Sequence, residues 1–416
     1  MIKSMEAEDD SKKNIVLIAA FYYLPDCNGG TERPKNFCYY LNKYGMQTYV
    51  LTAAYDHIDY SDDADHIFRV KDYRKNDSSS VITAAVKAKE ILQRRLGKPV
   101  RGEDAWAQRV KKNISSIINK LHPDVCIVTF PPPAVLDIGL YIKEQYPDIK
   151  LISDFRDGFL YAPMYQEMKS GARRIYRRFM ERYRSLELET VRKSDALITI
   201  ADGLTEYFRE QYGKQEVYTI GNGFNHEEEF HAKPVQLPKD QFVILFTGGL
   251  DCSRIGYFEY FTSFVENNRL ERLDVSLVMI GNYLDYEKEF FAKHKRMIVL
   301  PKQPRDKIIA TQRQADLLLN VTRDDEPIGT NGKLYEYLFS DKPVLNYGKH
   351  NNAERIIQET DSGRSYSREE SSQMDQFIMD LKEGKLEFQH RDLYKYTREY
   401  GVKQLMEIIA SLHCQS

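Results

Sequence analysis

Runs of apolar residues alternate with helix-type segments along this chain, and they do so in two separate series. The run NIVLIAAF (14–21), for example, reads as a buried strand, and a segment with helical periodicity follows it from Pro34 to Tyr44. Such alternation is typical of βαβ units, in which helices connect parallel strands. The sequence therefore predicts an α/β protein built on parallel sheets.

Each series supplies about half of the expected strands. The first comprises 14–21, 47–53, 124–130, 148–155 and 195–200, and the second comprises 241–248, 275–281, 297–300, 315–321 and 343–348. Residues 54–80 predict a long loop or an irregular strand, and 81–121 predict two helices that split near Gly97. The length of 416 residues fits two domains of roughly 200 residues each.

The expected domain boundaries follow from this division. We expect a disordered leader over 1–13, a first Rossmann-like domain over 14–220 and a second over 240–388. The polar, proline-containing segment 221–239 is the expected linker. The last segment, 389–416, is predicted to hold a helix that returns to the first domain.

Charge and cysteine usage exclude several classes of function. The formal net charge of −2 provides no field that would recruit nucleic acid. The five cysteines are scattered without a C-x-x-C pair, so neither a zinc site nor a disulfide framework is indicated, and a reduced cytoplasmic setting is expected.

No apolar run reaches the ~18 residues of a spanning helix. A G-x-G-x-x-G motif does not follow the first strand, which disfavours a dinucleotide-dependent dehydrogenase.

The segment GTNGKLYEYLFSDKPVL (329–345) is the strongest candidate for a binding site. A Gly/Asn loop before a short helix presents backbone N–H groups that can bind a diphosphate. The donor-binding residues predicted here are Thr330, Asn331, Gly332, Lys333, Leu334 and Glu336. Lys333 would add a cation, and Glu336 would accept hydrogen bonds from ribose hydroxyls. The alternative is an amphipathic helix preceded by a glycine turn, without a ligand.

A second loop of this kind follows the strand at 241–248. Gly248 and Gly249 would let a phosphate approach the backbone, and Arg254 would supply a permanent, forked cation. The alternative is that Arg254 is only a solvated charge at the start of a helix.

Five segments in order resemble family-4-type retaining glycosyltransferases of the GT-B class, over roughly residues 14–410. Besides the two loops, they are GGTER (29–33), DFRDGF (154–159) and the run from Asp195 to Asn225. The resemblance implies two Rossmann-like domains facing a central cleft, with the donor bound mainly by the second. It also implies a metal-independent, hexosyltransferase-type reaction with retention at the anomeric carbon.

The resemblance assigns roles to individual residues. Gly29 and Gly30 would close on the diphosphate from the facing domain, while Arg254 and Lys333 would stabilise its developing charge. On the acceptor side, Asp154, Arg156 and Asp157 would position or activate the acceptor, with the two aspartates as catalytic candidates. The alternative for these three is a capping and salt-bridge cluster.

Two departures from the family pattern stand out. The family often has two glutamates with seven residues between them; Glu336 fits the second, but Ile328 occupies the position of the first. Asp324, Asp325 or Glu326 would have to take over its role, or the role is lost. The common histidine of the first domain also lacks a match, because the corresponding segment reads TFPPPAV.

Two further segments have competing interpretations. The segment 168–193 carries nine Lys or Arg against three Glu, with apolar residues at helical spacing. It predicts a helix that lies on anionic lipid at the inner face of the cell membrane. The alternative is a helix that packs its apolar stripe into the core with its arginines in water, or one that pairs within a dimer. Asp63-Ala64-Asp65 is formally a metal-binding D-x-D, but no apolar strand precedes it, so a solvated loop is expected.

The sequence thus favours a retaining glycosyltransferase that moves a sugar from a nucleotide-diphosphate donor to a glycan or lipid-linked acceptor in polysaccharide or glycoconjugate synthesis. A uridine donor is the first guess, no cofactor or metal is expected, and the oligomeric state is left open. The alternatives are a non-catalytic GT-B scaffold that binds sugar or a partner protein, and a nucleotide-sugar 2-epimerase.

Overall fold

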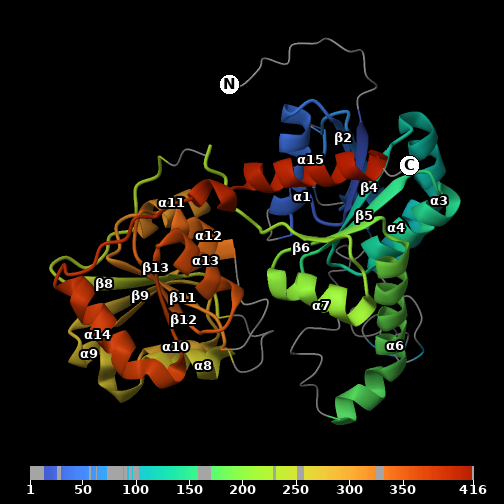
Figure 1. Ribbon diagram of the computed structural model, residues 1–416. Coiled ribbons are helices and arrows are strands. Elements are labelled where there is room, and N and C mark those ends of the chain that lie inside the picture. The colour runs from blue at the N-terminus through green and yellow to red at the C-terminus, as the bar shows by residue number, and fades with distance from the viewer. Residues whose placement is uncertain are drawn as a thin grey trace, which may run out of the picture.

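The computed structural model describes residues 14–25, 30–55, 58–61, 63–72, 88, 91–92, 96, 103–157, 170–227, 231–250, 257–324 and 332–414, the side chains of 170–180 excepted. These residues form two α/β bodies that lie side by side, each built around a parallel sheet (Figure 1). The predicted α/β class with parallel sheets is therefore confirmed.

The first body holds a seven-stranded sheet, counted over the described residues, with the order β3-β2-β1-β4-β5-β6-β7. Its strands are β1 (Ile15–Ala20), β2 (Gln47–Ala54), β3 (Ile67–Lys71), β4 (Val125–Phe130), β5 (Lys150–Phe155), β6 (Ala196–Thr199) and β7 (Val217–Thr219). Its helices are α1 (Glu32–Lys43), α3 (Glu103–Leu121), α4 (Ala134–Gln145), α6 (Ser170–Lys193) and α7 (Asp202–Tyr212).

The second body holds a six-stranded sheet over the described residues, with the order β10-β9-β8-β11-β12-β13. Its strands are β8 (Phe242–Thr247), β9 (Val275–Gly281), β10 (Met297–Pro301), β11 (Leu317–Val321), β12 (Val344–Tyr347) and β13 (Gly363–Tyr366). Its helices are α8 (Tyr257–Phe264), η1 (Glu266–Asn268), α9 (Arg269–Arg272), α10 (Asp285–Phe291), α11 (Arg305–Gln312), α12 (Gly332–Leu338), α13 (Asn352–Thr360), η2 (Arg368–Glu370) and α14 (Ser371–Lys382).

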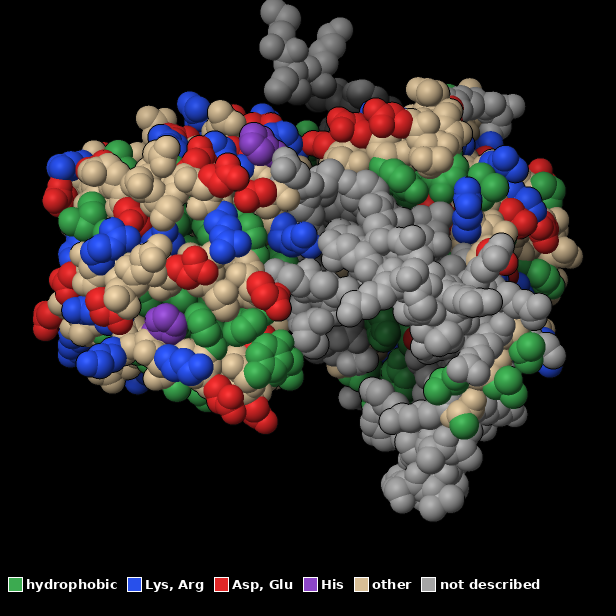
Figure 2. Space-filling view, turned by 90° about the horizontal axis from the view of Figure 1, so that it is seen from below, with side chains coloured by type: hydrophobic (Ala, Val, Ile, Leu, Met, Phe, Trp, Pro, Cys, Tyr) green, Lys and Arg blue, Asp and Glu red, His purple; other side chains and the backbone are tan. Residues whose placement is uncertain are grey.

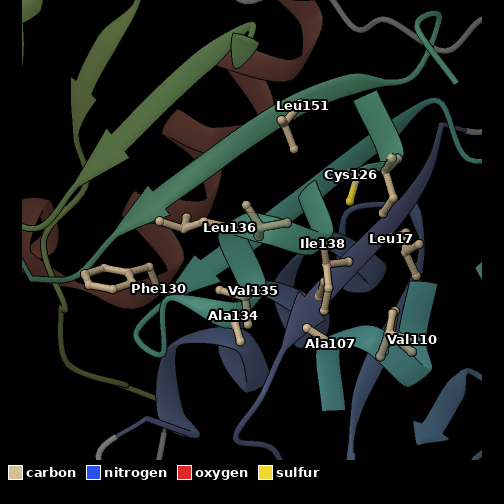
Figure 3. Packing of buried hydrophobic residues seen from close by; sticks show 14 of the residues in the cluster. Leu17, Ala107, Val110, Cys126, Phe130, Ala134, Val135, Leu136, Ile138 and Leu151 are labelled. Atoms are coloured by element: carbon tan, nitrogen blue, oxygen red, sulfur yellow. The ribbon is translucent and has the colours of Figure 1, made fainter. Parts of the chain in front are cut away.

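Side-chain alternation along the strands builds a core on each face of a sheet. In β1, Leu17 and Ala19 face a cluster with α3, α4 and α7, part of which Figure 3 shows in close-up. Val16 and Ile18 face the opposite cluster, whose helical members come from α1 and from α15 (Arg398–Cys414). The second sheet is sandwiched in the same way between two clusters.

The end of the chain returns to the first body, as predicted. After η3 (Leu393–Tyr396), α15 packs against α1 and completes one helical layer of the first sheet (Figure 1). The return segment runs beside the outgoing one, because the Phe224 N–H donates to the Tyr396 carbonyl at 2.9 Å and the Arg398 N–H donates to the Phe224 carbonyl at 2.9 Å. Two chain segments therefore join the bodies at one place.

Some elements differ from the sequence-based expectation. Within 54–80, residues 67–71 form a regular edge strand, β3, which pairs in parallel with β2. The short strands β7 and β13 were not predicted, since each spans only three or four residues and has a partly polar sequence. The leader 1–13 and most of 81–102 lie outside the described residues.

Charged side chains of both signs are interspersed over the second body on the face shown in Figure 2. This distribution agrees with the formal net charge of −2. Among the helices that the structure describes, none combines the length and the apolar composition that a bilayer-spanning segment needs.

Candidate functional site

The strand order reverses direction at β1 in the first sheet and at β8 in the second. β1 lies between β2 and β4, and β8 lies between β9 and β11. The helix after β1, α1, packs on the opposite face of its sheet from α4, the helix after β4, and α8 likewise packs on the opposite face from α12, the helix after β11. Ligands of open α/β sheets bind at such points, outside the carboxyl ends of the strands. Gly248 directly follows β8 and thus occupies this position in the second sheet.

The backbone around Gly248 is tightly held. Gly248 has φ +98, in the left-handed region that favours glycine. Its N–H donates to the Ile280 carbonyl at 2.8 Å, and its own carbonyl accepts the Tyr283 hydroxyl at 2.8 Å. A Cβ on Gly281 would lie only 2.3 Å from the Gly248 oxygen, so glycine is needed there as well. The first residue of the loop after β8 is consequently fixed against the end of β9.

Lys333 lies directly on this loop. It is the second residue of α12, and its Cε and Nζ are 2.8 and 3.1 Å from the point that a Cβ on Gly248 would occupy. The Nζ also sits 4.0 Å from the centroid of the Phe246 ring. The two loops that the sequence marked separately therefore meet, and a half-buried ammonium group lies at the carboxyl end of β8.

Glu336, one turn further along α12, forms an ion pair that the sequence did not predict. Arg305 at the start of α11 donates its Nε to Glu336 Oε1 at 3.0 Å. Both side chains are partly exposed. A carboxylate can accept about four hydrogen bonds, so this pairing leaves capacity for ribose hydroxyls while it fixes the orientation of Glu336.

The remaining donor-side candidates divide into described and undescribed residues. A Cβ added to Gly249 would lie 3.2 Å from the Asn282 carbonyl oxygen. Gly332 is the first residue of α12, and a Cβ added to it would have nothing within 4 Å. Leu334 is fully buried in the core beside α13, so a donor can meet only its backbone. The candidates Gly29, Arg254, Thr330 and Asn331 lie outside the described residues.

On the facing body, Asp154 is fully buried at the end of β5 and is paired with Arg33 of α1. The Arg33 Nε lies 3.0 and 2.9 Å from the two carboxylate oxygens, and the Thr129 hydroxyl donates to Oδ2 at 2.8 Å. Arg33 also donates to the carbonyls of Ile220 and Gly221. Asp154 thus anchors the start of α1 and the segment after β7; this arrangement matches the salt-bridge alternative for the 154–157 cluster.

Arg156 acts on the backbone of neighbouring loops. Its guanidinium donates to the carbonyls of Phe130, Gly30 and Pro131 at 3.1, 2.9 and 2.8 Å. Burial lowers the pKa of Arg156, although Asp154 and then Asp157 act in the opposite direction. Arg156 therefore holds the Gly30 end of the loop after β1 against the end of β4. Asp157 next to it is exposed.

Asp324 was one of three candidates to replace the missing glutamate at position 328. Its two oxygens accept the Tyr260 hydroxyl at 2.7 Å and the Lys349 N–H at 2.8 Å. These contacts connect the end of β11 to α8 and to the end of β12. Asp325 and Glu326 lie outside the described residues.

The D-x-D segment and the basic segment have structural partners where they are described. Asp63 is ion-paired with Arg69 of β3. In α6, Tyr183 is buried, Leu186 packs on the core of the first body, and Arg182 pairs with Asp104 of α3. The last part of this helix therefore contacts the core, as the alternative to lipid binding predicted.

Sequence reasoning missed three residues that shape the site: Tyr283, Arg305 and Arg33. Tyr283 and Arg305 carried no recognisable motif, because their roles depend on contacts between distant segments. Arg33 was part of the quoted GGTER match, and its place directly before the α1 pattern was the available signal.

Comparison with known proteins identifies the architecture. No family model and no curated protein matches this chain, but solved structures do. The N-terminal domain of trehalose-6-phosphate phosphatase from Candida albicans superposes with a TM-score of 0.62 at 13% identity, over 99% of this chain and 100% of that one. A UDP-forming α,α-trehalose-phosphate synthase from Burkholderia xenovorans gives 0.61 at 12% identity, over 97% and 100%.

A putative UDP-N-acetylglucosamine 2-epimerase from Listeria monocytogenes also superposes, with a TM-score of 0.55 at 14% identity, over 97% of this chain and 98% of that one. At such identities the likeness establishes the fold. The chain has the GT-B architecture, with two Rossmann-like bodies, and the predicted fold class is confirmed. Glycosyltransferases and 2-epimerases both occur among the matching structures, so the fold alone does not choose between them.

Proposed function

We propose that this protein is a retaining glycosyltransferase that binds a nucleotide-diphosphate sugar at the carboxyl edge of its second sheet. The observation that carries the proposal is the position of the Lys333 ammonium group directly against Gly248, at the strand where the order of the sheet reverses. A fixed cation next to the exposed Gly249 suits the oxygens of a diphosphate.

The remaining parts of the donor would be held by neighbouring residues. Glu336, oriented by Arg305, is proposed to accept hydrogen bonds from the ribose hydroxyls. The loops around Arg254 and around Thr330–Asn331 are proposed to complete the phosphate site. Arg156, which fixes the Gly30 carbonyl, would place the loop after β1 against the donor from the first body.

In the proposed reaction the bond between the anomeric carbon and the diphosphate oxygen breaks, and the electron pair remains on the diphosphate. Lys333 and the surrounding N–H groups would stabilise that developing charge. The acceptor hydroxyl forms the new bond on the face that the leaving group vacates, and its proton passes to a phosphate oxygen. Asp154 is buried against Arg33, so among the two aspartates we assign the contact with the acceptor to Asp157 and a positioning role to Asp154.

The acceptor is proposed to be a glycan or a lipid-linked sugar. The basic first part of α6 supports a contact with anionic lipid, since it carries Arg173, Arg174, Arg177 and Arg178. Sedimentation with anionic liposomes tests this point: neutralising these four arginines should abolish binding, whereas unchanged sedimentation would refute the membrane contact.

Product analysis tests the reaction itself. The protein would be incubated with a panel of nucleotide sugars without acceptor and followed by proton and phosphorus NMR. Slow release of nucleoside diphosphate together with a free sugar of retained anomeric configuration is expected. Inversion at sugar C2 would identify an epimerase instead. If no nucleotide sugar in the panel reacts and no nucleotide binds, the protein is a non-catalytic scaffold.

A further inference from the structure

A cavity of about 210 Å³ lies where the two bodies join. One wall comes from the first body, from the start of α7 and the segment after β7; the other comes from α12 and α13 of the second body. The return segment, η3 and α15, supplies the remaining lining residues. Figure 1 shows α7, α13 and α15 converging on this junction.

The cavity is separate from the candidate phosphate site. Lys333, which faces Gly248, and Tyr335, which lines the cavity, are two residues apart in α12. Residues at this spacing point to opposite sides of a helix. A hypothetical Cβ on Gly221, another lining residue, would lie 2.6 Å from the Tyr335 hydroxyl oxygen, which confirms that Tyr335 faces the junction. The cavity therefore does not depend on the proposed donor site.

A connected set of polar side chains lines the cavity. Arg355 of α13 pairs with Asp202 of α7 at 2.9 Å and with Glu359 at 2.7 Å, and the Tyr396 hydroxyl donates to Glu359 at 2.6 Å. These contacts orient the groups, yet a carboxylate accepts about four hydrogen bonds and a guanidinium has five donors. The array thus keeps donors and acceptors for a ligand. Its charges balance, because Lys395 and Arg355 offset Asp202 and Glu359.

Charge balance and size restrict the class of ligand. A phosphate or nucleotide needs an excess of positive charge, which the cavity lacks. Sites for drug-sized ligands measure about 300–1,000 Å³, so this cavity suits a smaller molecule. Tyr335, Tyr396 and Tyr400 add aromatic side chains to the polar array, a combination that suits a ring with both C–H and O–H surfaces. We propose that the cavity binds one neutral sugar ring.

Because its walls belong to both bodies, a sugar bound here would bridge them beside the two connecting segments. The site would therefore link the presence of a free sugar, or of one residue of a glycan, to the relative placement of the two sheets. Asp202 and Arg355 already form an ion pair between the bodies. A bound sugar would change the contact between the bodies through these two groups.

Saturation-transfer NMR and calorimetric titration on the full chain test the proposal. The probes are glucose, galactose, mannose and N-acetylglucosamine, with glucose 6-phosphate as the charged comparison. Gln404→Trp would fill the cavity from α15, and Glu407→Trp would place the same ring on the exposed face of that helix as a matched control. We expect at least one neutral sugar to bind the wild type and Glu407→Trp, and to bind Gln404→Trp about tenfold more weakly or not at all, since a filled cavity excludes the ring.

The proposal is overturned if no probe binds, if glucose 6-phosphate binds better than glucose, if Gln404→Trp binds as the wild type does, or if excess UDP displaces the sugar. Excess UDP separates this site from the donor site, because it should leave the sugar bound. Displacement by UDP would assign the sugar to the donor cleft instead. If no nucleoside diphosphate binds, the donor proposal fails, while the sugar result still decides the cavity.

Discussion

The Lys333 side chain lies against the α-carbon of Gly248, so that any side chain at position 248 would collide with it. A Cβ there would be 2.8 Å from Lys333 Cε, and the glycine already has φ +98. Each residue therefore constrains the other: glycine makes room for the lysine, and the lysine brings its charge to the end of β8.

Gly248→Ala should weaken nucleotide binding and also lower stability. The left-handed backbone costs a non-glycine residue about 1–2 kcal/mol, and the new methyl group would push Lys333 away. Chemical denaturation and UDP titration measure the two effects. Gly213→Ala is a matched control, because it is also left-handed (φ +65) but has nothing within 4 Å of its Cβ position. If both variants bind UDP as the wild type does, the loop does not hold phosphate.

Tyr283→Phe should weaken nucleotide binding while the fold is retained. The variant removes only the hydroxyl that donates to the Gly248 carbonyl, and one such hydrogen bond contributes about 1 kcal/mol, or roughly fivefold in affinity. Calorimetric titration with UDP gives the change, and Tyr218→Phe on β7, which is 37% exposed, serves as control. An unaltered affinity in Tyr283→Phe would show that this hydroxyl does not position the loop.

Asp154→Asn should destabilise the first body strongly. It leaves Arg33 buried without its carboxylate partner, and breaking a buried ion pair typically costs about 3–5 kcal/mol. Urea unfolding would report the loss. The exposed neighbour Asp157, changed to Asn, should keep stability close to that of the wild type. Equal stability of both variants would contradict the anchoring role of Asp154.

Acid should loosen the contact between α15 and α1. Burial acts to raise the pKa of Glu32, but Arg398 of α15, then Lys35 and Arg305, bring it below its usual value. A carboxyl group with a lowered folded-state pKa contributes stability above its unfolded value of 4.5, and this contribution is lost as the pH falls through the folded value. Melting temperatures of the wild type and Glu32→Gln should therefore differ near neutral pH and converge well below pH 4.5. A difference that persists at the lowest pH would refute this linkage.

The sequence predicted most of the fold because buried parallel strands have long apolar runs. β4 and β9, for example, are buried throughout and were found almost to the residue. The strands β7 and β13 were not predicted, and β3 was covered only by the expectation of a long loop or an irregular strand over 54–80. Edge strands are harder to predict because they are half exposed and carry polar residues. Their pairing depends on a neighbouring strand rather than on local pattern.

The candidate site was predictable only in part. The sequence marked Gly248 as a glycine at the end of a strand and Lys333 as a cation at the start of a helix. Only the fold shows that the two residues touch. The pairing of Arg305 with Glu336 leaves no local signal in the sequence. Arg33 belongs to the GGTER match, but only the fold shows that it pairs with Asp154. For Asp154 the consequence is substantial, since a residue predicted as catalytic is buried in a structural ion pair.

Nucleotide binding by the wild type and Lys333→Ala tests the central claim most directly. Thermal unfolding would be followed with a panel of nucleoside diphosphates and nucleotide sugars, with Lys293→Ala on the exposed surface as control. A ligand at 100 times its dissociation constant should stabilise the wild type and the control by about 2.7 kcal/mol. Lys333→Ala should lose most of this stabilisation while it melts normally without ligand. If no nucleotide stabilises the wild type, or if Lys333→Ala responds as strongly as the control, the donor site is not where we place it.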